Sequence, residues 1–179
     1  WEERNRWFSD LWADVGGRHQ QLTGTEDRER SAAYPVAIPY RLINMYSVYG
    51  DTVFDPFWGT GTTTLAAMAA GRHSVGKELD SGFETEFEAS VDGLTALTDR
   101  MVADRLSAHE TFVTERLAND ESFEYEADNY GFPVMTKQEV PIQLFRVAAV
   151  DRTESGYHLT HEPVGPDWRE EIAAPPVSD

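Results

Sequence analysis

Apolar residues occur along the chain in two patterns, short continuous runs typical of strands and a helical spacing, and together these patterns predict a mixed α/β fold. Short apolar runs at 52–54 and 74–77 each end beside an acidic residue and have the length of buried strands. Between them, residues 62–70 are rich in threonine and alanine and stop at a glycine, as helices often do. A strand, a turn, a helix and a second strand in this order predict a parallel βαβ unit.

Upstream of this unit, a helix is expected from about Pro39 to Tyr49, ending at Gly50. Apolar residues recur in it at helical spacing and are expected to face the core together: Leu42, Ile43, Tyr46 and Tyr49. The aromatic stretch at 6–15 is expected to form a short strand or helix, and the polar stretch at 18–30 a loop.

Downstream of residue 80 the apolar spacing predicts a longer helix. Ser81 and Glu84 match the capping-box pattern, and apolar residues continue at helical spacing to Leu117, with Gly93 as the point where a break is expected. Two strands are expected at 141–150 and 156–164, joined by a turn into a β-hairpin.

The expected architecture is therefore α/β with three segments. Residues 1–94 carry the sheet, residues 95–164 form a C-terminal extension of a long helix and a β-hairpin, and residues 165–179 form a disordered tail that is acidic and proline-rich. The chain starts at Trp1 rather than at a methionine, which suggests a piece of a longer protein. We expect its sheet to be incomplete, with an edge that the missing part covers.

Composition adds a strongly acidic surface. The chain carries 32 acidic residues against 15 basic ones and a formal charge of −17, which is typical of proteins that stay soluble in concentrated salt. Residues 1–41 hold six arginines and seven acids, so almost all of the negative charge lies downstream. If any part of this chain faces a nucleic acid, it is the N-terminal part.

Several classes of protein are excluded by composition. The chain has no cysteine, so disulfides and thiolate metal sites are absent, and it has no apolar run long enough to span a membrane. No signal peptide is legible, and a cytoplasmic location is expected. His158 and His161 are three residues apart on a predicted strand, where they would point to opposite faces, so we expect no metal site.

The stretch "VFDPFWGTGTTT" at 53–64 contains the residues that are expected to bind a ligand. Its glycine pair lets the backbone approach a ligand, and the helix that follows offers free N–H groups to an anion. The stretch lacks the Gly-Lys-Ser/Thr of a phosphate-binding loop and the third glycine of a dinucleotide fingerprint. Glu78 ends the next strand, where a carboxylate can bind ribose hydroxyls, so S-adenosylmethionine fits this pattern better than NAD.

Three segments resemble those of the DNA amino-methyltransferases, which make N6-methyladenine or N4-methylcytosine. They are "YPVAIPYRLI" from Tyr34, "DPFWGTGTT" from Asp55 and "GRHSVGKELD" from Gly71, in the family's order. The resemblance implies a Rossmann-like methyltransferase sheet, S-adenosylmethionine as cofactor and DNA as partner. It implies that one group lines the methionine part of the cofactor, namely Asp55, Phe57, Gly59, Gly61 and Thr62. It places Glu78 on the ribose and Leu79 beside the adenine, with the amino-acid end covered by Tyr34, Pro35, Ile38 and Pro39.

The family's catalytic motif, Asn/Asp/Ser-Pro-Pro-Tyr, is missing from the chain. The only Pro-Pro is Pro175-Pro176, followed by Val177. We therefore assign no catalytic residue and expect the isolated chain to be inactive. The motif would belong to a missing N-terminal half or a partner chain, through which DNA is bound. Two alternatives stay open: a non-catalytic, truncated methyltransferase-like binding or regulatory module, and an RNA guanine-N2 methyltransferase.

Overall fold

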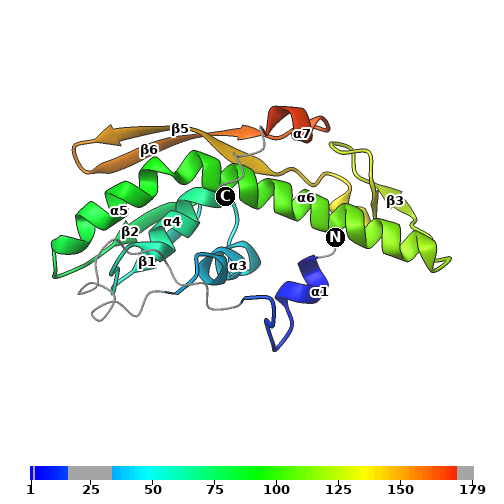
Figure 1. The fold of residues 1–179 in the computed structure, drawn as a ribbon, viewed down its shortest axis with the longest axis horizontal. Helices are drawn as coiled ribbons and strands as arrows, with labels where there is room; N and C mark the ends of the chain where they lie inside the picture. The colour runs from blue at the N-terminus through cyan, green and yellow to red at the C-terminus, as the bar shows by residue number, and fades with distance from the viewer. Residues whose placement is uncertain (2, 16–33, 173–179) are drawn as a thin grey trace, which may run out of the picture. The chain divides into compact units, whose positions relative to one another are not determined.

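The computed structural model describes residues 1, 3–15 and 34–172 (Figure 1). The chain divides into two compact units, each built from more than one stretch of sequence. Unit 1 comprises Trp1–Ser9, Thr95–Ala149 and Thr160–Asp179, and unit 2 comprises Asp10–Leu94 and Val150–Leu159. The loop expected at 18–30 lies outside the described residues. No helix in the described part of the chain is both long and apolar enough to cross a membrane.

Unit 2 contains the predicted βαβ unit. Strands β1 (Thr52–Asp55) and β2 (His73–Gly76) pair in parallel, and helix α4 (Thr62–Ala69) connects them. This arrangement confirms the α/β prediction. Asp55 is in register with Gly76, so the carboxyl ends of both strands meet at one edge. Among the described residues, no further strand joins this pair.

Helix α3 (Ala37–Tyr46) packs on α4, but not with the face that the sequence predicts. Only Ile43 of the expected residues is buried, whereas the side chain of Tyr46 is 74% exposed. The helix starts two residues earlier than expected and buries Pro39, Tyr40 and Ile43. Ile43 lies three residues after Tyr40 and four after Pro39, so it shares a face of the helix with both. Tyr49 lies beyond the end of the helix, so helical spacing cannot place it on that face.

Helix α5 (Gly82–Asp92) also contacts α4, and its N-terminus corrects a second prediction. The side chain of Ser81 makes no capping hydrogen bond, so the expected capping box does not form. Instead, Asp80 Oδ1 accepts a hydrogen bond of 2.9 Å from the N–H of Gly82. A separate helix, α6 (Leu94–Ala118), follows after Gly93, which confirms the predicted break.

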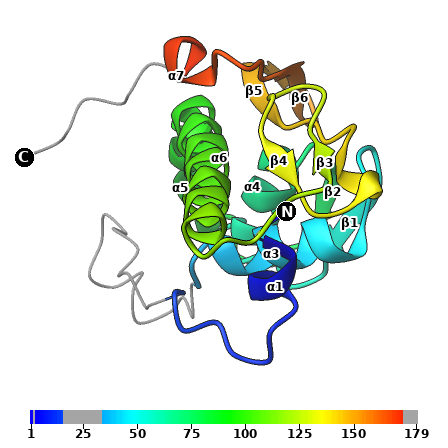
Figure 2. The ribbon, with the colours of Figure 1, turned by 90° about the vertical axis from the view of Figure 1, so that its right-hand side faces the viewer.

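Unit 1 is organised around α6, which Figure 2 views end on. The other elements are α1 (Glu3–Trp7), the short strands β3 (Tyr125–Glu126) and β4 (Pro133–Val134), the 3₁₀ helix η1 (Lys137–Glu139) and α7 (Trp168–Glu171). Sequence reasoning missed β3, β4 and η1, because two- or three-residue elements carry no readable period. One apolar core joins the unit, and it is formed by Trp1, Val102, Leu106, Ala127, Phe132, Val134, Leu144, Val164, Trp168 and Ile172.

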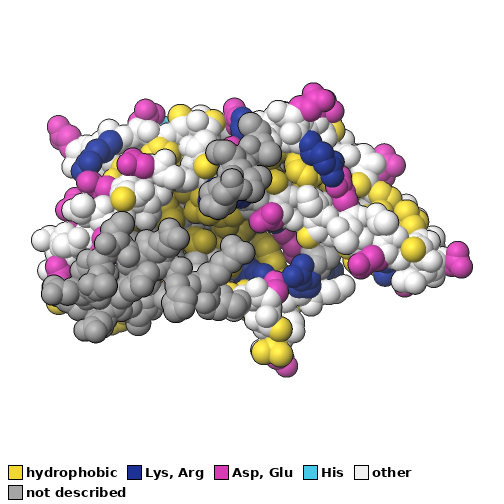
Figure 3. Space-filling view, in the orientation of Figure 1, with side chains coloured by type: hydrophobic (Ala, Val, Ile, Leu, Met, Phe, Trp, Pro, Cys, Tyr) yellow, Lys and Arg dark blue, Asp and Glu magenta, His cyan; other side chains and the backbone are white. Residues whose placement is uncertain are grey.

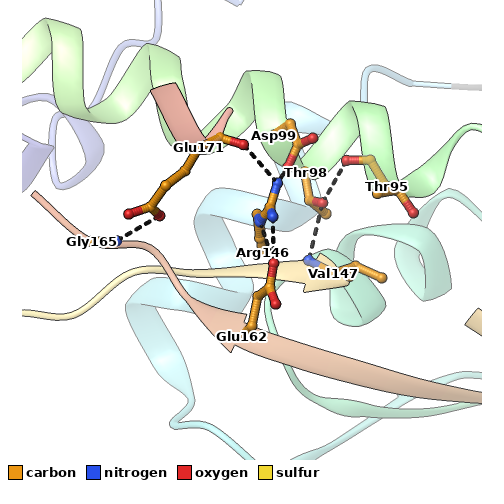
Figure 4. A network of polar contacts seen from close by, with 8 residues as sticks. All are labelled: Thr95, Thr98, Asp99, Arg146, Val147, Glu162, Gly165 and Glu171. Carbon is orange, nitrogen blue, oxygen red and sulfur yellow. Dashed lines mark hydrogen bonds and ion pairs between the residues drawn. The ribbon is translucent and has the colours of Figure 1, made fainter. Parts of the chain in front are cut away.

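The predicted hairpin is present as β5 (Phe145–Thr153) and β6 (Gly156–Pro163). A polar network fixes its base in unit 1 (Figure 4). Arg146 Nε donates to Glu162 Oε1 at 2.7 Å, and Arg146 Nη1 lies 3.3 Å from Asp99 Oδ1. The N–H of Val147 donates to Thr98 Oγ1 at 3.2 Å. These contacts join the two hairpin strands to α6.

The expected disordered tail is wrong for residues 165–172. Helix α7 forms there, and the side chains of Trp168 and Ile172 are only 6% and 5% exposed. These two apolar side chains account for the difference, because they have a core to enter even though the surrounding sequence is acidic. Residues 173–179 lie outside the described part of the chain.

Candidate functional site

The turn between β1 and α4 is shaped by its two glycines. Gly59 has φ +54° and Gly61 has φ +75°, a left-handed conformation that favours glycine. Gly61 is the N-cap residue of α4 and no side chain caps it. The N–H groups of the first helical turn have no acceptor within the helix, so they can bind an anion that approaches the turn.

Asp55 ends β1 with one carboxylate oxygen engaged. Its Oδ1 accepts a hydrogen bond of 3.0 Å from the N–H of Phe57, which bends the chain into the turn. Its Oδ2 has no hydrogen-bond partner among the described residues. Asp55 is half-buried, so this oxygen is held in place and can accept from a cationic group of a ligand.

Glu78 follows β2 and is tied to the same turn. Its Oε2 accepts from the N–H of Gly59 at 2.8 Å, and its Oε1 accepts from the N–H groups of Leu79 and Asp80 at 2.8 and 3.0 Å. These bonds, the one from Asp80 foremost, hold the pKa of Glu78 below its ordinary value. The side chain is exposed but fixed, and the charge sits at the end of the sheet.

The segment from Tyr34 to Pro39 meets the start of α4. The hydroxyls of Tyr34 and Thr63 are 2.7 Å apart, which joins this segment to the residue after Thr62. The N–H of Ile38 donates to the carbonyl of Pro35 at 3.0 Å, and Pro39 is buried in the first turn of α3. Contacts therefore link all three sequence segments at this turn: Tyr34 with Thr63, and Gly59 with Glu78.

Phe57 and Leu79 are the exposed apolar residues that follow the ends of β1 and β2. They follow the two strand ends closely in the chain, and their side chains are 89% and 95% exposed. Exposed apolar side chains also occur elsewhere in the described residues, so these two are of interest for their position beside the strand ends rather than for their exposure. Thr62, in contrast, is only 8% exposed, so its side chain supports the helix terminus from within.

Trp58 is a supporting residue that sequence reasoning missed. Its indole Nε1 donates to Thr64 Oγ1 at 2.8 Å, and that hydroxyl lies 2.9 Å from Ser74 Oγ. The ring covers Gly76, where a Cβ would lie 2.6 Å from Trp58 Cγ. Only a glycine fits under the ring at this position. The sequence feature that could have indicated this role is the position of Trp58, a large aromatic residue between Phe57 and Gly59 of the cofactor motif.

In residues 1, 3–15 and 34–172, no three His, Asp or Glu side chains gather where they could hold a metal ion. His158 is exposed and His161 half-buried on β6.

Comparison with known proteins finds a family match for the first half of the chain. Residues 1–89 match the family model described as DNA methylase, of the N6/N4 type. The chain is 46% identical over 145 residues to the type II methyltransferase M.MthZI of Methanothermobacter thermautotrophicus, covering 81% of this chain and 39% of that protein. It is 46% identical over 90 residues to the type II methyltransferase M.MjaI of Methanocaldococcus jannaschii, covering 50% of this chain and 29% of that protein.

Among solved structures, a protein of Thermus thermophilus described as a DNA modification methylase, complexed with S-adenosyl-L-methionine, is 31% identical. The match covers 50% of this chain and 30% of that one, with a TM-score of 0.39. The chain thus spans well under half the length of these relatives. The 145-residue match to M.MthZI necessarily extends beyond residue 89, so part of the C-terminal extension is shared with that relative.

Proposed function

Because residues 1–89 belong to the DNA methylase family, we propose that this chain is the cofactor-binding part of an S-adenosylmethionine-dependent DNA methyltransferase. The whole enzyme would methylate an exocyclic amino group of adenine or cytosine at specific sites, as a type II modification enzyme. One observation carries the proposal: Asp55, the N-terminus of α4 and Glu78 meet at the carboxyl ends of two parallel strands. Ligands of open α/β sheets bind at that edge.

The groups at this edge match the charges of the cofactor. Its carboxylate would face the free N–H groups of α4, and its ammonium group would face Asp55 Oδ2. A Cβ on Gly59 would meet only Phe57 O, at 3.9 Å, so the space beside the turn is open to a ligand. Phe57 and Leu79 would lose exposed apolar surface against the bound molecule.

The structure limits how many ribose hydroxyls Glu78 could bind. A carboxylate offers about four acceptor positions, and three are already used by N–H groups of the backbone. The remaining position, on Oε2, can accept one ribose hydroxyl without loss of a bond to the turn. A second hydroxyl would have to share an oxygen. Glu78 would therefore hold the ribose and the Gly59 turn together.

Methyl transfer itself would need residues from outside this chain. The bound cofactor would supply an electrophilic methyl group, and this chain would orient it. The chain has no Pro-Pro followed by an aromatic residue, since Val177 follows its only Pro-Pro. A flipped base would be held by a catalytic segment from the remainder of the enzyme, either in the same polypeptide or in a partner chain.

The sheet offers a surface for that remainder. Thr52, Phe54, His73 and Val75 point to the face opposite α4, and all four are exposed. Phe54 and Val75 are in register, with 61% and 55% of their side chains exposed. Since parallel sheets are normally covered on both faces, we propose that the rest of the methyltransferase packs here.

DNA would be bound through the remainder of the enzyme. Acidic side chains are spread over the face that Figure 3 draws, and they would repel the phosphate backbone. Several arginines are already in ion pairs: Arg41, Arg105, Arg116, Arg146, Arg152 and Arg169. The RNA guanine-N2 alternative gains nothing from these observations, and neither does the non-catalytic module.

Binding of cofactor by the chain itself tests this proposal. S-adenosylmethionine or S-adenosylhomocysteine at 100 times its Kd should stabilise unit 2 by about 2.7 kcal/mol, and NAD should not stabilise it. Calorimetric titration of wild type, Asp55→Asn and Glu84→Gln then locates the site. Glu84 is an exposed acid on α5, so only the Asp55 variant should lose affinity. A folded wild-type chain that binds neither sulfonium nor thioether ligand would overturn the assignment.

A further inference from the structure

The tip of the C-terminal hairpin belongs to the same compact unit as the cofactor motifs. Val150–Leu159 is part of unit 2, although it lies more than 70 residues downstream of Glu78. Arg152 forms an ion pair with Glu88 of α5, and the ring of Tyr157 makes an edge contact with Phe87 at 5.9 Å between centroids. The hairpin tip therefore packs on α5 (Figure 1).

Phe87 also packs against the glycine turn. Its side chain is 4% exposed, and its ring lies 4.7 Å from that of Trp58 in an edge-on arrangement. Both rings close in on Gly61. A Cβ there would lie 2.8 Å from Trp58 Cζ2 and 2.9 Å from Phe87 Cε2. The two rings thus fill the space behind the residue that caps α4.

This packing restricts a turn whose two glycines would otherwise leave its backbone flexible. Gly59 and Gly61 can adopt many backbone conformations, so their own sequence does not hold the turn in one of them. The rings of Trp58 and Phe87 restrict Gly61 from behind, and the ring of Tyr157 restricts Phe87. Without such support, ligand binding would have to order the turn, and the lost entropy would lower the affinity.

We propose that the hairpin tip is a positioning element for the cofactor site, in which Tyr157 acts on the Gly61 turn through Phe87 and Trp58. This inference rests on the proposed cofactor function. It assigns the tip of the C-terminal extension a part in cofactor binding that is exerted through other side chains. Tyr157 is accordingly a positioning residue.

The test compares cofactor affinity across three hairpin variants of the full chain. Tyr157→Ala removes the ring and should raise the Kd for S-adenosylhomocysteine about threefold to tenfold, the range expected for loss of one aromatic pair. Tyr157→Phe keeps the ring and should stay within about twofold of wild type. His158→Ala is the matched control, because His158 is the exposed neighbour whose side chain points to the other face of β6.

A double-mutant cycle with Phe87→Leu tests the route. If Tyr157 acts through Phe87, the double variant should bind no worse than about twofold beyond Phe87→Leu alone. Hydrogen exchange of the Gly59 and Gly61 amides, which donate to Glu78 Oε2 and to the carbonyl of Trp58, should accelerate in Tyr157→Ala, measured at a temperature where all variants are folded. A wild-type chain that binds cofactor while Tyr157→Ala binds equally well, with unchanged exchange in the turn, would overturn the inference alone. Failure of the wild type to bind would overturn the proposed function.

Discussion

Gly61→Ala tests the packing around the turn, because the structure separates its two costs. One is the left-handed backbone at φ +75°, which costs an alanine about 1–2 kcal/mol. The other is the collision of the new Cβ with the rings of Phe87 and Trp58, for which overpacking of a core typically costs about 1–3 kcal/mol. Against these costs, any glycine-to-alanine change lowers the conformational entropy of the unfolded chain, which stabilises the folded state by about 0.4–1 kcal/mol.

Two other glycines of unit 2 provide controls. Gly50 has φ +82° and a Cβ added there would have nothing within 4 Å, so Gly50→Ala carries the backbone cost alone. Gly76 has no positive φ, but its Cβ would strike Trp58, so Gly76→Ala carries the collision alone. The difference in unfolding free energy between Gly61→Ala and Gly50→Ala cancels the shared terms and should be about 1–3 kcal/mol.

Hydrogen exchange of α4 amides at increasing urea concentration is the suitable assay. The chain has two compact units, and the α4 amides report on unit 2, to which α4 belongs. Linear extrapolation gives the unfolding free energy of each variant. Equal destabilisation by Gly61→Ala and Gly50→Ala, within about 0.5 kcal/mol, would refute the packing of both rings against Gly61.

Glu78→Gln should weaken cofactor binding roughly tenfold or more, because the amide group cannot accept from every N–H that the carboxylate holds. Since the folded pKa of Glu78 is lowered, the melting temperature gap between wild type and this variant should be constant well above pH 4.5 and close at lower pH. Thr98→Val should destabilise unit 1 by about 1–3 kcal/mol, because the buried N–H of Val147 loses its acceptor. Thr114→Val, at an exposed hydroxyl, should cost less than about 0.5 kcal/mol in the same urea titration.

The sequence by itself determined the local chemistry of unit 2. The order of apolar runs and glycines placed β1, α4 and β2 within a residue or two, because strand length and helix termini depend on neighbouring residues. It also placed Asp55 and Glu78 at the strand ends, since parallel strands joined by a helix bring their carboxyl ends to the same edge.

Only the tertiary structure decided which side chains are buried and what holds the turn. α3 buries Tyr40 rather than Tyr46, because the face that a helix buries depends on the element packed beside it, here α4. The contact of Tyr157 with Phe87 joins residues 70 positions apart, which no local pattern encodes. Burial is a property of the assembled core, so the support of the glycine turn became visible only once distant segments were in contact.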